Sequence, residues 1–111
     1  MRVSFSHDSK EFIFKLKSHI SKDNPSRAKS YTIKLVSRIR DMLQHPYIGK
    51  INATFDDESI REIILDGMKI IYKIYPNSIG VVMIYKYIDL DEDYIERARR
   101  CSRDIKDYYE S

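Results

Sequence analysis

Residues 59–87 constrain the fold most, because they contain three runs rich in Ile, Val and Tyr that are separated by two turn signals. Asp66 and Gly67 form the first turn signal, and the PNS sequence at residues 76–78 forms the second. Runs of β-branched and aromatic residues bounded in this way are typical of strands joined as hairpins. We therefore predict an antiparallel meander with strands at residues 60–65, 69–75 and 81–88.

The middle strand of this meander has two chemically different faces, because successive side chains of a strand point to opposite sides. One face should pack beneath helices and consists of Ile70, Tyr72 and Ile74. The other face combines cations with apolar and aromatic side chains, namely Lys69, Ile71, Lys73 and Tyr75. We expect the cations and tyrosine of this mixed face to be accessible to a partner.

Two helices are predicted ahead of the meander, after a short strand at residues 3–5. Asp8 and Glu11 have the spacing of a capping box, so the first helix should begin there and end at the KDNPS segment. Asn24 is a favourable N-cap and Pro25 suits a first helical turn, which places the start of the second helix. The apolar stripe of the second helix recurs at helical spacing over four turns and comprises Ala28, Tyr31, Thr32, Leu35, Val36, Ile39, Met42 and Leu43.

A third helix is predicted at about residues 92–110. Acidic residues come first in this segment and basic residues later, which is the order that the helix dipole favours. The complete order is then strand, two helices, three-strand meander and helix, which is typical of the α+β class. We predict one domain over residues 1–111, an antiparallel sheet with a helical hairpin packed on one face and an extra C-terminal helix.

Composition limits the classes of protein to be considered. A chain of 111 residues is large enough for one core. It contains no apolar run long enough to span a membrane and no signal-peptide core, so we expect a cytoplasmic location and no membrane association. The net charge of +3 divides into about +7 over residues 1–55 and about −4 over residues 56–111. The basic half favours nucleic acid or an acidic partner, and a solvated helix face explains the same count equally well.

Several chemistries lack support in the sequence. His7, His19, His45 and Cys101 do not have the spacing of metal ligands, so we expect no metal site. The three glycines do not form a phosphate-binding loop, and no motif supports a nucleophilic triad. We therefore expect no cofactor.

The order and spacing of the predicted elements resemble the RelE/ParE superfamily of toxins from type II toxin–antitoxin systems. The resemblance covers about residues 3–87 and is carried by the segments HPYIGK, SIREIIL, KIIYKI and VVMIYKY. It implies a growth-inhibiting toxin and, as partner, a small antitoxin whose disordered segment folds along the toxin surface. It also implies that DNA is contacted only indirectly, through the antitoxin complex.

The superfamily includes ribosome-dependent endoribonucleases similar to RelE and DNA gyrase inhibitors similar to ParE. The nuclease chemistry requires cations near the scissile phosphate. Where the RelE pattern places basic residues, this chain has Ile60, Glu62 and Ile64, and its acidic segment at residues 89–93 would repel a phosphate. The pair Arg61 and Glu62 instead resembles the RE pair of the ParE branch, so we predict a ParE-like protein with no catalytic residues and with gyrase as its target.

Residues predicted to bind the target or the antitoxin are Arg61, Glu62, Lys69, Lys73, Tyr87, Tyr94, Arg97 and Arg100. Arg61 is equally well explained as a structural ion-pair residue, and Tyr94 as an aromatic residue of a helix face. We expect the antitoxin to dock where the C-terminal helix meets the sheet.

Two alternative functions remain open. The first is a ribosome-dependent mRNA endoribonuclease with a diverged site, for which the candidate residues are Lys50, Lys69, Lys73, Lys86 and Tyr87. The second is a degenerate member of the superfamily that binds an antitoxin and is no longer toxic.

Overall fold

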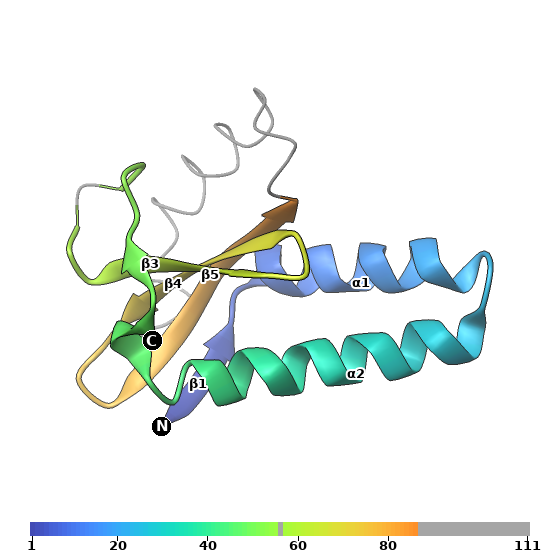
Figure 1. Ribbon diagram of the computed structural model, residues 1–111, viewed down its shortest axis with the longest axis horizontal. Helices are drawn as coiled ribbons and strands as arrows, with labels where there is room; N and C mark the ends of the chain where they lie inside the picture. The colour runs from blue at the N-terminus through green and yellow to red at the C-terminus, as the bar shows by residue number, and fades with distance from the viewer. Residues whose placement is uncertain (56, 87–111) are drawn as a thin grey trace.

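The three predicted meander strands form the centre of a five-stranded sheet in the computed structural model, which describes residues 1–55 and 57–86 (Figure 1). The order of strands across the sheet is β1-β5-β4-β3-β2. The elements are β1 (Arg2–Phe5), α1 (His7–Ser21), α2 (Pro25–Met42), the short 3-10 helix η1 (Pro46–Ile48), β2 (Lys50–Ile51), β3 (Ile60–Leu65), β4 (Met68–Ile74) and β5 (Ser78–Lys86).

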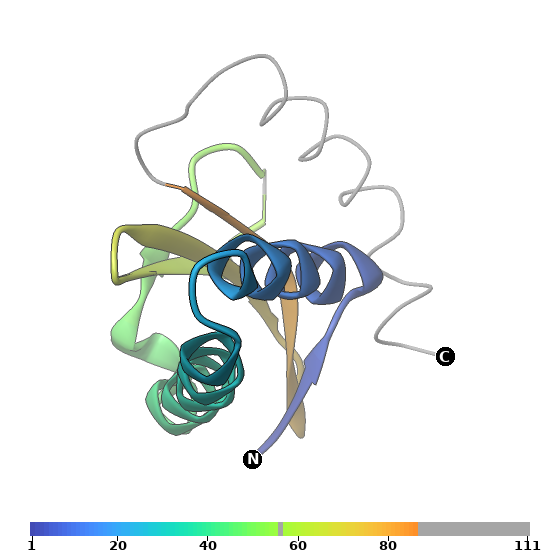
Figure 2. The same cartoon turned by 90° about the vertical axis from the view of Figure 1, so that its right-hand side faces the viewer.

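The two helices lie antiparallel on one face of the sheet, and Figure 2 views them nearly along their axes. The α+β class and the helical hairpin packed on one face are confirmed. The predicted C-terminal helix at about residues 92–110 lies outside the described residues.

The sheet is mixed, and the prediction of a purely antiparallel sheet was wrong. Strand β1 pairs with β5 in parallel, with Val3 opposite Ile79 and Phe5 opposite Val81. Strands β2, β3, β4 and β5 pair antiparallel in succession. A parallel pair needs a long crossover connection, which here runs through both helices and the other strands, so local sequence signals did not indicate it.

The turn between β3 and β4 has the conformation that its sequence predicts. Asp66 and Gly67 have φ values of 53° and 75°, which is the left-handed region that two-residue hairpin turns require at both central positions. Asp66 also connects this turn to α2, because its Oδ2 accepts hydrogen bonds from Arg38 Nη1 at 3.0 Å and from Tyr31 OH at 3.2 Å. The tip of the hairpin is therefore fixed to the helical layer.

Helix α2 begins as predicted, with Asn24 as its N-cap accepting a hydrogen bond from the Arg27 amide at 3.0 Å. Helix α1 does not use the predicted capping box of Asp8 and Glu11. Its N-cap is Ser6, whose hydroxyl oxygen accepts a hydrogen bond from the Ser9 amide at 3.1 Å. Glu11 forms an ion pair with Lys15 instead.

A β-bulge in β5 changes which side chains face each layer. Ile71 pairs with Met83 but the next residue, Tyr72, pairs with Val81, so Val82 is the additional residue on β5. The carbonyl groups of Val81 and Val82 at the bulge accept hydrogen bonds from the hydroxyl groups of Ser9 at 3.1 Å and Ser6 at 2.6 Å. The start of α1 is therefore joined to the centre of the sheet.

The sheet carries a separate apolar cluster on each face. The cluster beneath the helices includes Leu35, Ile39, Ile70 and Tyr72, with Ile74 packed at its margin, as the strand pattern predicted. The cluster on the opposite face, called here the outer cluster, consists of Phe55, Ile60, Ile71, Val82, Met83 and Tyr85. All six of its members are buried, so the mixed face is more apolar than the sequence indicated.

We predict that Ile70→Ala lowers the free energy of unfolding by about 2–5 kcal/mol, because it truncates a fully buried core side chain. Ile64→Ala on the neighbouring strand is the matched control, since Ile64 is 51% exposed and its loss should change stability by about 0.5 kcal/mol or less. Urea denaturation measures both values. Equal costs for the two variants would contradict the assignment of the strand faces.

Candidate functional site

The predicted binding residues lie on opposite faces of the sheet. Arg61 is on the helix side, where it pairs in register with Tyr72. Glu62, Lys69 and Lys73 lie on the face of the outer cluster. The other predicted candidates, Tyr87, Tyr94, Arg97 and Arg100, are outside the described residues.

The two lysines of the outer face are paired with carboxylates of the same chain. Lys69 Nζ lies 2.8 Å from Glu62 Oε2, and the two side chains are only 13% and 6% exposed. Asn52 Nδ2 lies 3.5 Å from the other oxygen of Glu62. The expectation that these cations are accessible was wrong, because side-chain pairs across neighbouring strands cannot be read from one strand alone.

Lys73 is held in a similar way at the far end of β4. Its Nζ lies 3.7 Å from Asp57 Oδ2 and 5.2 Å from the centre of the Tyr75 ring. Hydrogen bonds from the hydroxyl and amide groups of Ser59 hold the pKa of Asp57 below its ordinary value, and Lys73 adds to this effect. Asp57 therefore remains a carboxylate that partly neutralises Lys73.

The cations of the outer face are not arranged as cleavage of a phosphodiester would require. Cleavage of a phosphodiester needs donors directed at the developing negative charge. Lys69 and Lys73 are directed at carboxylates instead, and Lys50, opposite Glu62 in register, is an exposed side chain at the edge strand β2. A phosphate approaching this face would meet the Asp57 carboxylate beside Lys73, whereas Glu62 and Lys69 are largely buried.

Arg61 has a different environment, which sequence reasoning described only in part. Its Nη1 donates a hydrogen bond to the Gly49 carbonyl at 3.0 Å, and its guanidinium lies 4.9 Å from the centre of the Tyr47 ring. Arg61 therefore holds the segment between η1 and β2, and it forms no ion pair with a described residue. The suggested role as an ion-pair residue does not describe its contacts.

Tyr72 of β4 also holds the segment from Pro46 to Gly49 through its hydroxyl group. Its hydroxyl donates to the Pro46 carbonyl at 2.5 Å and accepts from the Gly49 amide at 3.0 Å. Burial raises the pKa of Tyr72, so the hydroxyl remains a donor at neutral pH. A Cβ atom at Gly49 would collide with this hydroxyl and lie 2.6 Å from the Glu62 carbonyl, so the segment requires glycine there.

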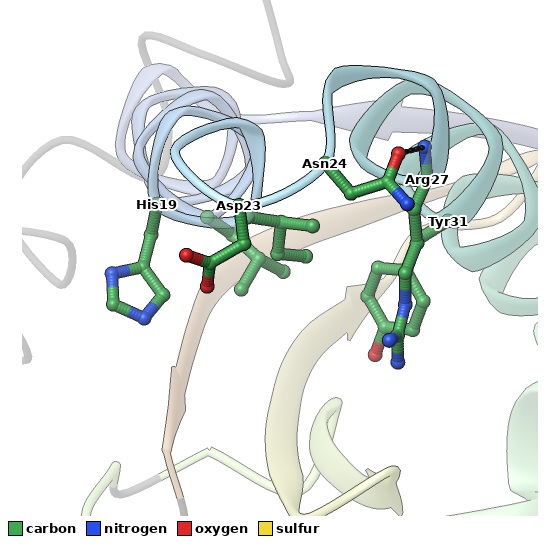
Figure 3. Close-up of a pocket in the computed structure, with 7 residues that line it drawn as sticks. His19, Asp23, Asn24, Arg27 and Tyr31 are labelled. Carbon is green, nitrogen blue, oxygen red and sulfur yellow. Dashed lines mark hydrogen bonds between the residues drawn. The ribbon is translucent and has the colours of Figure 1, made fainter.

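Among the described residues, one hollow lies beside the sheet and another beside the helical hairpin. One has a volume of about 470 Å³ and lies beside Arg61, between η1, the start of β3 and the turn from β4 to β5. The other, of about 390 Å³, lies at the turn between α1 and α2. In Figure 3, His19 and Asp23 project on one side of this second hollow and Arg27 and Tyr31 on the other.

The helical hairpin is the basic part of the described chain. Lys15 and Arg38 form ion pairs with Glu11 and Asp66. Within the described ranges, the hairpin cations that make no ion pair are Lys10, Lys17, Lys22, Arg27, Lys29, Lys34 and Arg40, the last of which donates to the Val3 carbonyl. This layer therefore carries most of the Lys and Arg residues of the described part of the chain.

Among residues 1–55 and 57–86, no three His, Cys, Asp or Glu side chains gather as metal ligands would. No helix in this part of the chain has the length and apolar character needed to cross a membrane.

The helical hairpin on a five-stranded mixed sheet defines a small α+β domain. A family model described as ParE toxin of type II toxin-antitoxin system, parDE, matches residues 3–86, and the chain belongs to this family. The predicted resemblance and its ParE branch are confirmed.

A solved structure titled "Chromosomal ParDE TA system from P. aeruginosa" has the same fold, with a TM-score of 0.62. The comparison covers 78% of this chain and 95% of that chain at 12% identity, so it supports the fold alone. A search of curated proteins found no match.

We predict that the ion pair on the outer face is a structural element of the fold. Glu62→Leu should lower the free energy of unfolding by about 3–5 kcal/mol, because it removes the carboxylate that lies 2.8 Å from the largely buried Lys69 ammonium. The double variant Glu62→Leu with Lys69→Met should recover most of this loss, since both charges are then removed. Urea denaturation of the single and double variants measures the difference, and equal stability of the two variants would count against a structural pair.

Proposed function

We propose that this ParE toxin arrests bacterial growth in the cytoplasm by binding DNA gyrase, and that a cognate ParD-type antitoxin neutralises it. Family membership supports the toxin and its antitoxin partner. The inhibition of gyrase, by contrast, rests on the ParE branch to which the chain belongs and on the chemistry of the outer face.

The observation that carries the proposal is the pairing of Lys69 with Glu62 and of Lys73 with Asp57. Removal of a single preorganised donor from an enzyme's oxyanion site commonly costs about 10²- to 10³-fold in rate. A nuclease built on this face would have two such cations engaged by carboxylates in its resting state. Inhibition through protein contacts requires no such donors, so the paired lysines favour binding over cleavage.

We predict that the purified toxin inhibits supercoiling by gyrase and leaves ribosome-bound messenger RNA intact. Both assays should be run on one preparation, together with a sample premixed with antitoxin, in which supercoiling should be restored. Codon-specific cuts in the message with normal supercoiling would contradict the proposal and favour the endoribonuclease alternative. Absence of both effects, together with normal growth on induction, would favour the degenerate alternative.

A further inference from the structure

Arg61 is a cation whose hydrogen-bonding capacity is only partly used. A guanidinium group carries five N–H donors in a fixed plane. In Arg61, the Nη1 atom donates to the Gly49 carbonyl. The Nε atom is buried and has no hydrogen-bond partner among the described residues. Because Nε is buried, an incoming carboxylate would reach the guanidinium through its Nη groups, which carry four of the five donors and make one hydrogen bond, to Gly49.

This makes Arg61 different from the buried cations of the outer face. Lys69 and Lys73 each have a carboxylate of the same chain within ion-pair distance. Arg61 has none in the described part of the chain, and Glu58, which lines the same hollow, forms no ion pair with it. A carboxylate from another molecule would supply the missing charge.

The hollow of about 470 Å³ beside Arg61 is large enough to receive side chains of a partner. Its lining combines Ser59 and Tyr75 with apolar surface from Ile74 and Pro76. The lining therefore suits a segment that carries both a carboxylate and an apolar side chain.

The surface next to this hollow has the composition of a binding hot spot. Tyr47 and Ile48 of η1 are 71% and 58% exposed, and the Tyr47 ring lies against the Arg61 guanidinium. Tyrosine and arginine are enriched among the residues that contribute most to interfaces. An apolar side chain of a partner could cover Tyr47 and Ile48 while its neighbouring carboxylate reaches Arg61.

The segment that presents these residues is fixed before any partner binds. Tyr72 holds the Pro46 carbonyl and the Gly49 amide, and Gly49 leaves no space between the segment and the sheet. Little conformational entropy is then lost when a partner docks, which favours affinity. Tyr72 thereby positions the segment without lining the hollow itself.

We infer that the hollow beside Arg61 binds an acidic segment of the ParD-type antitoxin, with a carboxylate paired to the Arg61 guanidinium and an apolar side chain packed on Tyr47. The inference rests on the proposed function, which supplies the antitoxin as partner. Charge complementarity supports an acidic segment, since Arg61 lines the hollow and forms no ion pair with a described residue. A disordered antitoxin segment can follow a surface over several such docking points.

The test is calorimetric titration of the full-length toxin with its cognate antitoxin. Arg61→Met keeps the aliphatic stem and removes the charge, and should weaken affinity at least about 30-fold, as expected for loss of one partner of an interfacial charge pair. Tyr72→Phe is the matched control, because it removes the contacts to Pro46 and Gly49 but keeps the cation. It should weaken affinity far less than Arg61→Met does.

A second variant keeps the inference testable if Arg61→Met does not fold. Tyr47 is 71% exposed, so Tyr47→Ala should fold normally, and it should weaken antitoxin affinity about 5- to 30-fold if the ring is covered in the complex. Unchanged affinity for Tyr47→Ala would overturn the inference.

Three other outcomes would also overturn it. The first is unchanged affinity for Arg61→Met. The second is an equal loss for Tyr72→Phe, which would show that Arg61 acts only by holding the segment. The third is loss of growth arrest by Arg61→Met with full antitoxin affinity, which would assign the hollow to the target. Failure of the unmodified toxin to bind the antitoxin would instead contradict the proposed function, and the inference with it.

Discussion

Two backbone carbonyl groups at the bulge of β5 determine how the helical layer is joined to the sheet. The Val81 carbonyl accepts hydrogen bonds from the Ser6 amide at 3.0 Å and the Ser9 hydroxyl, and the Val82 carbonyl accepts one from the Ser6 hydroxyl. Both serines are almost completely buried, so no solvent competes for these bonds. Each buried carbonyl left without a donor would cost about 1–3 kcal/mol, which is a large fraction of the stability of a small domain.

The same bulge divides the side chains of β5 between the two apolar clusters. Val81 and Ile84 face the helices, whereas the two residues between them, Val82 and Met83, both lie in the outer cluster. Strict alternation would have placed neighbouring residues on opposite faces. The additional residue therefore supplies the outer cluster, and Ser6 satisfies the carbonyl that the bulge displaces from regular pairing.

The arrangement of the two faces then separates two kinds of charged residue. On the outer face, Glu62 and Lys69 neutralise each other within an apolar surrounding. On the helix side, Arg61 holds the segment after η1 and has no carboxylate among the described residues. Arg61 and Glu62 are neighbours in β3 but differ in how their charges are balanced. Glu62 forms an ion pair with Lys69 of the same chain, whereas Arg61 remains available for an ion pair with a carboxylate of a partner protein.

Sequence reasoning predicted the features that depend on short stretches of chain. The meander, its Asp66–Gly67 turn, the Asn24 cap and the faces of α2 and β4 follow from local periodicity and turn chemistry. It missed the features that depend on distant partners. These features are the parallel pairing of β1, the short strand β2, the hydrogen bond from Ser6 to the Val82 carbonyl and the ion-paired lysines. Each requires knowledge of which strands and loops lie side by side.

We propose that this toxin acts through protein contacts and that Lys69 and Lys73 of its outer face maintain the fold. The most direct measurement is growth arrest on induction of the double variant Glu62→Leu with Lys69→Met, compared with the unmodified chain at equal protein level. We predict the same arrest for both, because neither side chain is needed for chemistry on a phosphate. Loss of arrest in a double variant that is still folded and still binds the antitoxin would contradict it.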